Sequence, residues 1–334
     1  MILTLTVNPS IDRLARLDTE LKRGGVFRLP MAEDMAGGKG INVSKALHYA
    51  GEKTLALYPA SDSGKFTRLL EVSGIPHEAI NTTNEARVNL TLAEPDGTTT
   101  KLNSPGMTLT KAHRRRVLEK LIHHAKHATW VVFAGSLPPG VPRDFYVQCT
   151  EAVYSVNPNI RVAMDTSDGP LTEVVRAFPK VRPFLMKPNA YELGQIIDQD
   201  GEELEAAAAE GNYLPVAQAA RALNELGVSE VLATLGEAGA VLSVKSGGCF
   251  AATSPSIVAQ STVGAGDCAL AGYVMSRERG DSYQDALTTA VAYGAAATSL
   301  PGTTIPYPEQ VHPEAGRLWP VSYTHLTLPT TPYV

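Results

Sequence analysis

Cysteine is scarce in this chain of 334 residues, and its positions argue against two classes of protein. Cys149, Cys249 and Cys268 are odd in number and far apart in the sequence. This pattern fits neither a disulfide framework nor a zinc site. The sequence therefore predicts a protein of the reducing cytoplasm.

Long apolar runs and a strong charge of one sign are also missing. No apolar stretch is long enough to span a bilayer, and the apolar opening at residues 1–7 is too short for a signal-peptide core. The formal net charge is only -5, which gives no global attraction to nucleic acid or to an anionic membrane. We expect small metabolites as partners, with no nucleic acid and no membrane.

Short β-rich runs alternate with helical patterns over most of the chain. This rhythm predicts an α/β fold with a mainly parallel central sheet and helices on both of its faces. The expected strands are residues 3–7, 54–58, 130–133, 161–164, 184–186 and 231–235.

Two segments break this rhythm and alternate as strands do, namely residues 14–29 and residues 87–102. Both lie close in the sequence to polar motifs. We therefore expect one small β-sheet that covers a substrate cleft as a lid. A pair of edge hairpins without functional motion is the alternative.

A single domain is expected over residues 1–318, with the lid segments inserted at about 12–30 and 86–103. The last stretch, residues 319–334, is rich in Thr and Pro and differs from the helical sequence before it. We expect this tail to be disordered or foreign to the natural protein.

The strongest local motif is a Gly-rich turn at residues 261–268, which is followed by a helix of small residues. Such a turn leaves backbone N–H groups unpaired at the start of the helix, where they form an anion site. Asp267 falls in the first helical turn, where its carboxylate could accept a proton from an attacking hydroxyl. The alternative is that Asp267 only caps its helix.

A second Gly-rich turn, Gly37-Gly38-Lys39-Gly40 with Asn42, also precedes a helix. Its backbone can approach a ligand closely, and Lys39 adds a positive charge. Neither turn matches the P-loop pattern, and the dinucleotide fingerprint is absent from the sequence. These absences argue against a P-loop phosphate site and against a hydride-transfer enzyme.

Three further polar clusters fall where strands should end, at residues 135–140, 187–192 and 234–239. In open α/β sheets the ligand cleft lies beyond the carboxyl ends of the strands, so these clusters favour one shared site. Each cluster also has a structural alternative. The first could be only a turn, Asn189 could only cap a helix, and Gly236 with Gly239 could only bend the backbone.

Together with Asn8-Pro9-Ser10-Ile11-Asp12, these motifs resemble, in this order, the ribokinase-type (PfkB) carbohydrate kinase family. The resemblance covers the chain to about residue 308. It implies a ribokinase-like three-layer αβα sandwich with a small β-sheet lid. Within the family the pattern is most similar to the bacterial 1-phosphofructokinases, which belong to a group that phosphorylates sugars already carrying one phosphate.

The resemblance also implies roles for individual residues. Asp267 matches the catalytic base, and Gly264, Ala265 and Gly266 match the anion hole that stabilises the transferred phosphoryl group. Positions matched to the sugar and its phosphate are Asp12, Gly37, Gly38, Lys39, Asn42, Arg87, Asn89 and Ser136.

The nucleotide half of the site is implied in the same way. Positions matched to ATP are Lys187, Asn189, Glu192, Thr234, Gly236, Gly239 and Thr262. Asn189 and Glu192 also match positions linked to Mg²⁺ through water, because magnesium keeps several waters in such sites. Thr262 and the small-residue helix at 290–298 are expected to border the adenine pocket.

The implied activity is ATP-dependent phosphorylation of a phosphosugar hydroxyl, with fructose 1-phosphate converted to fructose 1,6-bisphosphate. Tagatose-6-phosphate kinase and 6-phosphofructokinase, which belong to the same family, are the nearest alternatives. A sugar-phosphate sensor without turnover is a rival from another class. Relatives often pair through the lid sheet, so a homodimer is also expected.

Overall fold

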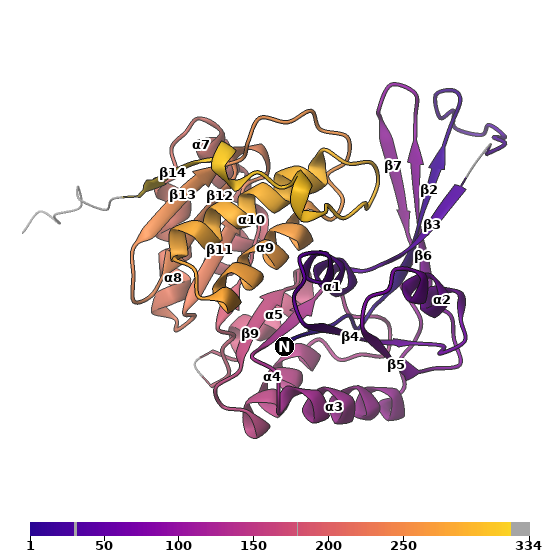
Figure 1. Cartoon of the computed structure of the whole chain (residues 1–334), viewed down its shortest axis with the longest axis horizontal. Coiled ribbons are helices and arrows are strands. Elements are labelled where there is room, and N and C mark those ends of the chain that lie inside the picture. The colour runs from indigo at the N-terminus through magenta and orange to yellow at the C-terminus, as the bar shows by residue number, and fades with distance from the viewer. Residues whose placement is uncertain (30–31, 179, 322–334) are drawn as a thin grey trace, which may run out of the picture.

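The computed structural model describes residues 1–29, 32–178 and 180–321, and a large β-sheet crosses this part of the chain (Figure 1). Its strands are β1 (Ile2–Leu5), β4 (Thr54–Ala60), β5 (His77–Asn81), β8 (Trp130–Ala134), β9 (Arg161–Asp165), β10 (Leu185–Met186), β11 (Glu230–Thr234), β12 (Ala240–Val244), β13 (Cys249–Thr253) and β14 (Arg317–Pro320).

The order of strands across this sheet is β14-β13-β12-β11-β10-β9-β8-β1-β4-β5. All pairs from β11 to β5 are parallel, whereas β12, β13 and β14 pair antiparallel at the other end. The predicted α/β fold with a mainly parallel sheet is confirmed. The carboxyl ends of the parallel strands therefore meet at one edge of the sheet, where a ligand cleft is expected.

Helices cover both faces of the sheet, which confirms the predicted three layers (Figure 1). On one face lie α1 (Lys39–Tyr49), α9 (Ala265–Arg279) and α10 (Tyr283–Thr298). On the other lie α3 (Lys111–Ala125), α4 (Phe145–Val156), α5 (Asp168–Arg176), α6 (Ala190–Ile197), α7 (Gly201–Ala209) and α8 (Leu214–Glu225). A shorter helix, α2 (Lys65–Val72), packs beside β4.

Alternation of side chains along each strand builds the two apolar cores. In β8, Trp130 and Val132 pack on the side of α1, α9 and α10, while Val131 and Phe133 pack on the opposite side. All four side chains are fully buried. Because burial of such a side chain contributes roughly 1.5–3 kcal/mol, the strand stabilises both layers at once.

A second, four-stranded sheet stands apart from the large one and rises at its side (Figure 1). It consists of β2 (Ser10–Arg16), β3 (Ala32–Gly37), β6 (Arg87–Ala93) and β7 (Thr99–Asn103), in the order β3-β2-β6-β7. We call it the lid sheet. The sequence of residues 87–102 predicts alternating strands with a turn at Pro95, Asp96 and Gly97, and the structure confirms a hairpin in which β6 pairs antiparallel with β7.

The first lid segment differs from the expected boundaries. The sequence pattern placed strands within residues 14–29, but β2 ends at Arg16 and the next strand begins at Ala32. Residues 17–29 connect the two strands and contain turn and bend conformations but no strand. Apolar residues in this connection, such as Leu17 and Phe27, pack onto the lid sheet and so imitate the alternation of a strand.

The described part of the C-terminal tail continues the large sheet. Trp319 and Pro320, at the start of the expected tail, belong to β14, and the Trp319 ring packs against Tyr213 with centroids 5.2 Å apart. Residues 322–334, the rest of that tail, lie outside the described residues. Among the described residues, no helix has the length and apolar character needed to cross a membrane.

Candidate active site

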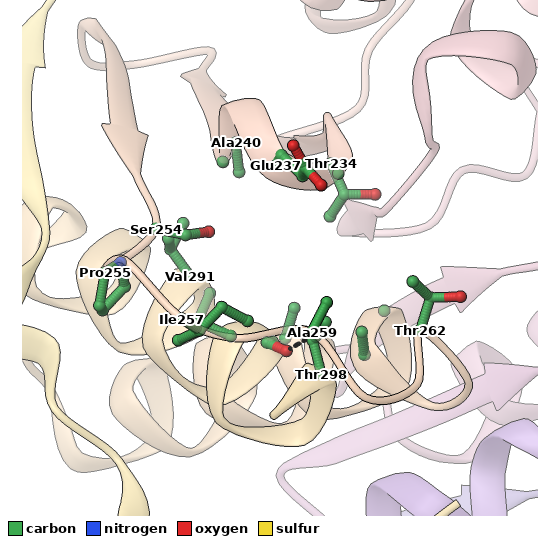
Figure 2. Close-up of a pocket in the computed structure, with 18 of the residues that line it drawn as sticks. Thr234, Glu237, Ala240, Ser254, Pro255, Ile257, Ala259, Thr262, Val291 and Thr298 are labelled. Atoms are coloured by element: carbon green, nitrogen blue, oxygen red, sulfur yellow. Dashed lines mark hydrogen bonds between the residues drawn. The ribbon is translucent and has the colours of Figure 1, made fainter. Parts of the chain in front are cut away.

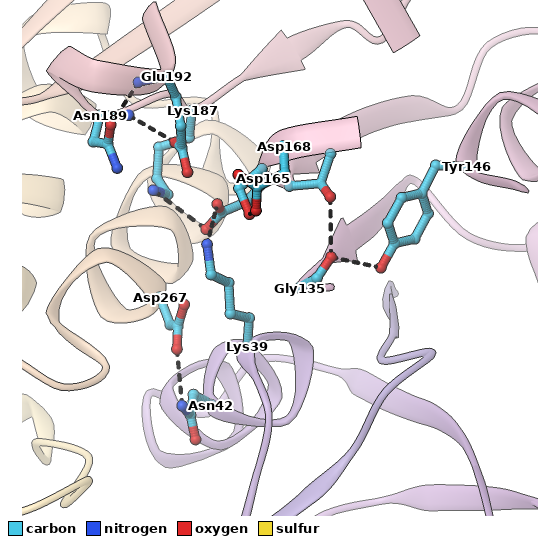
Figure 3. Close-up of polar contacts among 12 residues, drawn as sticks. Lys39, Asn42, Gly135, Tyr146, Asp165, Asp168, Lys187, Asn189, Glu192 and Asp267 are labelled. Carbon is cyan, nitrogen blue, oxygen red and sulfur yellow. Dashed lines mark hydrogen bonds and ion pairs between the residues drawn. The ribbon is translucent and has the colours of Figure 1, made fainter. Parts of the chain in front are cut away.

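Asp267 lies in the first turn of α9, at the carboxyl edge of the large sheet (Figure 3). Gly264 is the residue that begins the helix, with a φ of 81° that favours glycine, and no side chain caps this helix end. The Asp267 carboxylate instead accepts a hydrogen bond from Asn42 Nδ2 of α1, at 2.8 Å. The alternative of a simple helix cap therefore does not describe the contacts of Asp267.

The electrostatic surroundings of Asp267 suit proton transfer. Burial raises the pKa of its carboxyl to about 7, although the nearby Lys39 ammonium opposes this rise. Only 6% of the residue is exposed. A carboxylate that titrates near neutrality accepts a proton more readily than an ordinary aspartate and remains ionised at slightly alkaline pH.

A buried carboxylate, Asp165, joins two lysines beside Asp267 (Figure 3). Lys39 Nζ lies 2.8 Å from Asp165 Oδ1, and Lys187 Nζ lies 3.2 Å from Asp165 Oδ2. Burial alone would raise the pKa of Asp165, but Lys187 and Lys39 outweigh it and hold the pKa below its usual value. Asp165 therefore stays ionised and fixes both ammonium groups at the mouth of the site.

The sequence motifs did not point to Asp165, although it is the last residue of β9. Its neighbours in space come from distant segments, since Lys39 begins α1 and Lys187 follows β10. The position of Asp165 at the end of a strand was the sequence signal that could have identified it as a site residue. Lys39, one of the positions matched to the sugar, forms its ion pair with Asp165.

The Gly-rich turn and Lys187 meet at the start of α9. A methyl group built on Gly266 would lie 3.3 Å from Lys187 Nζ, so the ammonium lies directly over this turn. The first N–H groups of α9 have no partners within the helix. Gly264, Ala265, Gly266 and Lys187 thus form one positively polarised surface that suits a phosphoryl group.

Asn189 and Glu192 form a capping box at the start of α6. Glu192 N–H donates to Asn189 Oδ1 at 2.8 Å, and Asn189 N–H donates to Glu192 Oε2 at 2.9 Å. Burial raises the pKa of Glu192, and Asp165 adds to this effect. Asn189 therefore does cap its helix. It also pairs with Thr234 in an isolated β-bridge beside the polar cluster at residues 234–239, so the cap does not exclude a further role.

A cavity of about 540 Å³ opens beside this surface (Figure 2). Four of the positions matched to the nucleotide line it, namely Thr234, Gly236, Gly239 and Thr262. Small residues of α9 and α10 form its floor: Ala265, Gly266, Ala269, Ala290, Gly294 and Ala295. The volume and the largely apolar lining are typical of a site for a small ligand.

On the other side of Asp267, the lid sheet presents polar groups toward the glycine turn at Gly37. The Asp12 carboxylate accepts hydrogen bonds from Ser10 Oγ at 2.7 Å and Asn89 Nδ2 at 3.3 Å. Any side chain at Gly37 would collide with this carboxylate. Burial raises the pKa of Asp12, with Ser10, Asn89 and nearby cations acting against the rise.

Several buried polar atoms on this side have no hydrogen-bond partner among the described residues. They include Asn42 Oδ1, Asn89 Oδ1 and Arg87 Nε, which all belong to positions matched to the sugar. Arg87 uses Nη1 to bind Ser104 O at 2.8 Å. Because unpaired buried polar groups are rare, this concentration indicates that a polar ligand completes the hydrogen bonds here.

Two residues near the positions matched to the sugar were given no role by the motif analysis, although Asn8 belongs to one of its motifs. Asn8 Nδ2 donates to Ser136 Oγ and to Pro105 O, both at 3.1 Å, and so orients Ser136. Lys45 is only 7% exposed and donates to the carbonyl of Ala36 at the end of β3. Burial lowers the pKa of Lys45 to about 8, while Asp12 opposes this effect. A lysine on the buried face of α1 was the signal that could have found it.

Comparison with known proteins agrees with this geometry. The pattern of the pfkB family carbohydrate kinases matches residues 8–310. The chain belongs to this family. As a pfkB family member it is a kinase that phosphorylates a hydroxyl group of a carbohydrate, and the family resemblance inferred from the motifs is confirmed.

Individual relatives and solved structures show which known proteins this chain resembles. The chain is 34% identical over 273 residues to a 1-phosphofructokinase of Xanthomonas campestris pv. campestris, covering 81% of this chain and 82% of the relative. Its fold matches the phosphofructokinase-2 of Escherichia coli in complex with substrates and products, with a TM-score of 0.80, 26% identity, and coverage of 92% and 96%. Arabidopsis thaliana ribokinase shares the fold, with a TM-score of 0.69, 16% identity, and coverage of 94% and 96%.

Proposed function

We propose that this chain transfers the γ-phosphoryl group of ATP to the free primary hydroxyl of fructose 1-phosphate and forms fructose 1,6-bisphosphate. The observation that carries the proposal is the position of Asp267. It directly follows two residues that line the nucleotide-sized cavity, and its carboxylate contacts Asn42 on the side of the unpaired polar atoms. The name of the Xanthomonas relative supports fructose 1-phosphate as the acceptor.

In this mechanism Asp267 is the general base. Its carboxylate takes the proton of the sugar hydroxyl as the oxygen attacks the γ-phosphorus, and the bond from that phosphorus to the bridging oxygen of ADP breaks. Asn42 holds the carboxylate in place through its 2.8 Å hydrogen bond. The pKa near 7 leaves the base ionised at neutral to alkaline pH and still able to hold the proton.

Charge on the transferring group is balanced by the surface at the start of α9. The turn at Gly264, Ala265 and Gly266 would supply backbone N–H donors at the start of the helix, where the N–H of Ala265 also makes a long bond to Thr262 O at 3.4 Å, and Lys187 lies over Gly266. Preorganised donors of this kind stabilise the transition state because they need no reorientation as charge develops. Lys39 and Lys187 are both held there by Asp165.

The oxygen donors of Asn189 and Glu192 fit Mg²⁺, which prefers oxygen ligands and retains waters. No cluster of three His, Cys, Asp or Glu side chains that could hold a metal directly occurs among the described residues, so contact through water suits this site. When bound with ATP, the ion would offset the negative charge of its phosphates. The capping box fixes both side chains for this role.

Acceptor recognition is assigned to the lid side of the site. Asp12, Asn42 and the backbone at Gly38 would bind sugar hydroxyls. The bond from Asn89 to Asp12 and the unpaired Asn42 Oδ1 among the described residues support this assignment. The phosphate already on the sugar would bind Arg87, Asn89 and Ser136. The fork of an arginine binds phosphate oxygens in pairs, and Arg87 Nε has no partner among the described residues.

The decisive experiment compares acceptors. Purified protein with Mg-ATP is given fructose 1-phosphate, fructose 6-phosphate or tagatose 6-phosphate in separate assays, and kcat/KM is obtained from ADP release. We expect fructose 1-phosphate to exceed the other two by at least tenfold. A preference for either 6-phosphate would show that this sugar phosphate is the acceptor, and the chain would remain a kinase of the same family.

Fructose 6-phosphate is the second candidate, because the E. coli phosphofructokinase-2 structure covers 92% of this chain at a TM-score of 0.80. The rival reading as a sensor without turnover predicts binding of the phosphosugar but no ADP release with any acceptor. The hydrogen bond from Asn42 to Asp267 and the position of Lys187 over Gly266 argue for turnover.

The proposal includes a homodimer that pairs through the lid sheet. Leu102 on β7 is 55% exposed, and Val26 in the connection from β2 to β3 is 93% exposed. Exposed apolar side chains on an isolated sheet favour a protein partner. Light scattering after gel filtration should give twice the mass of 35.5 kDa for the native chain and a lower mass for Leu102→Glu; a monomer for the native chain would contradict the dimer.

Action in the reducing cytoplasm also remains part of this proposal. Cys149 and Cys268 are buried free thiols. Burial raises the pKa of both thiols, which keeps them protonated and unreactive.

A further inference from the structure

A second cavity lies at the amino ends of β9, β10 and β11, at the edge of the sheet opposite the active site. Its volume is about 570 Å³, which is within the usual range for sites that bind small molecules. Arg161, the first residue of β9, lines this cavity, while Asp165 at the other end of the same strand holds the active-site lysines. The cavity is therefore separate from the site described above.

The lining of this cavity is strongly positive. It contains Arg161, Lys180, Arg182 and Lys245, and the described residues of the lining include no Asp or Glu. None of these four cations forms an ion pair within residues 1–29, 32–178 and 180–321. Four unpaired cations in one hollow contrast with the net charge of -5 of the whole chain. Such a concentration attracts anions.

The cationic groups are partly held in place before any ligand arrives. The Arg161 guanidinium lies 5.3 Å from the Trp130 ring centroid and 5.7 Å from that of Phe184, and its Nη1 donates to Arg277 O at 3.3 Å. Arg182 lies across the turn at Gly227, where any side chain would collide with its guanidinium. Preorganised donors lose less entropy when they bind a ligand.

Neighbouring titratable groups offset only part of this charge, through the attraction between Arg161 and the buried Glu230. Burial raises the pKa of Tyr154 to about 12, so its hydroxyl stays neutral, and it donates to Arg182 O at 2.9 Å. The nearby Glu230 is 1% exposed and is already bound by Tyr273 Oη at 2.8 Å and Arg277 Nη2 at 3.4 Å. The cavity thus presents its positive charge to solvent.

We propose that this cavity binds a small anion that carries two or more phosphate groups. Arginine forks and lysine ammonium groups together suit dense phosphate charge, and four of them exceed what a single phosphate needs. A nucleoside triphosphate and a sugar bisphosphate share this chemistry. The inference goes beyond the kinase activity and does not depend on which sugar the active site takes.

Equilibrium dialysis with labelled inorganic tripolyphosphate tests the site at fixed ionic strength. Three full-length proteins are compared: the native chain, the variant Lys180→Gln/Arg182→Gln/Lys245→Gln, and the control Lys111→Gln/Arg115→Gln/Lys126→Gln, whose residues lie on α3 or directly after it. All substituted side chains are exposed, and both variants lose the same charge. Binding at the active site contributes equally to all three.

We expect the cavity variant to lose one equivalent of binding or to bind it at least tenfold more weakly, while the control matches the native chain. Kinase turnover should be equal in all three, which shows that they fold. If the triple variant loses turnover, the single variants Lys180→Gln and Lys245→Gln take its place, and each should weaken the same equivalent at least twofold.

Unchanged binding in the cavity variants, or an equal loss in the control, would overturn the proposal. Competition on the native chain then distinguishes the two sources of phosphate. It measures whether ATP or fructose 1,6-bisphosphate displaces the equivalent of tripolyphosphate that the cavity variant does not bind. If the cavity variant loses this equivalent and keeps its turnover, the result supports the cavity proposal and leaves the proposed function untouched. If the native chain shows no turnover but binds this equivalent, the result contradicts only the proposed function.

Discussion

At the scale of single residues, Asp267 occupies the proposed catalytic position although the ionised form of its carboxylate is unfavourable in the folded protein. Its carboxylate is buried, and burial raises its pKa to about 7. A group with a raised pKa binds its proton more tightly in the folded than in the unfolded chain, so its charged form destabilises the fold above that pKa. Asp267 is therefore retained at the expense of stability, which is common for catalytic carboxylates.

Substitution of this residue separates chemistry from binding. We expect Asp267→Asn to lower kcat by about a hundredfold or more, because the amide cannot accept the proton, while KM for ATP and acceptor changes little. Steady-state kinetics with both substrates varied measures this. The exposed Asp62→Asn is the matched control and should behave as the native chain; turnover of Asp267→Asn near that of the control would remove Asp267 from the role of base.

The pH dependence of the reaction rate also tests the role of Asp267 as general base. Since the base must be ionised, and kcat/KM reports the pKa of the free enzyme, kcat/KM for the acceptor should rise about tenfold per pH unit below 7 and level off above it. The Asn42 hydrogen bond favours the charged carboxylate and lowers its pKa. In Asn42→Ala the midpoint of this profile should therefore move to higher pH. A midpoint that stays or falls would show that another group controls the profile.

At the scale of elements, the site depends on how α1 meets the lid sheet. Lys45 on α1 donates to Ala36 O at the end of β3, and its charge favours the ionised form of Asp12. The lysine is 7% exposed, so both interactions occur in a medium that screens charge weakly. It is thus a positioning residue for the glycine turn and Asp12.

We predict that Lys45→Met raises KM for the acceptor at least fivefold and leaves KM for ATP unchanged. The substitution leaves a buried carbonyl without its donor, at roughly 1–3 kcal/mol, and removes the cation beside Asp12. Lys45→Arg restores charge and donor and should recover part of the affinity. Equal changes in both KM values would indicate a general loss of structure instead.

The packing of α9 against α10 sets the floor of the nucleotide cavity. Gly294 on α10 lines this cavity, and a methyl group added there would meet Ala265 O at 3.4 Å and Ala269 Cβ at 3.5 Å, which are ordinary contacts. Gly294→Ala should therefore keep KM for ATP within about twofold. Gly294→Leu should fill part of the cavity and raise KM for ATP at least tenfold, with KM for the acceptor unchanged. A similar KM for ATP in both variants would place the adenine ring elsewhere.

At the scale of the whole molecule, Asp34 of β3 forms one ion pair within the lid sheet and one that connects this sheet to the body. Arg13 of β2 binds it through Nε at 2.6 Å and Nη2 at 2.7 Å, and Lys65 at the start of α2 forms the link to the body. The Arg13 hydrogen bonds hold the pKa of Asp34 lowered to about 2, so these pairs persist throughout the working pH range.

Cutting only the link to the body tests this tether. In Lys65→Met the pair of Arg13 with Asp34 remains within the lid sheet, so the lid should stay folded but move more freely. We expect faster amide hydrogen exchange in β2 and β3 and a two- to fivefold higher KM for the acceptor. Lys111→Met is the exposed control. Unchanged exchange in β2 and β3 would show that the tether does not restrain the lid.

Much of the site could be predicted because its chemistry depends on local backbone. The turns at residues 37–40 and 264–267 carry their own glycines, and each opens a helix as expected. Strand identity also followed from local pattern, since β8 and β9 are buried on both faces. The connection at residues 17–29 was misassigned because apolar side chains that pack onto a sheet alternate like a strand.

The sequence by itself determined the βα alternation, the two glycine turns and the family, since each depends on residues that are near neighbours in the chain. Only the tertiary structure decided that Asp165 would join Lys39 and Lys187, that Lys45 would bind Ala36, and that four cations would gather in a second cavity. Lys45 and Ala36 are only nine residues apart and meet where α1 packs beside β3. The groups around Asp165 and in the second cavity are far apart in sequence and meet because parallel strands bring their ends to common edges of the sheet. Burial at those edges, which also sets the pKa of Asp267, is a property of the packed molecule and not of any motif.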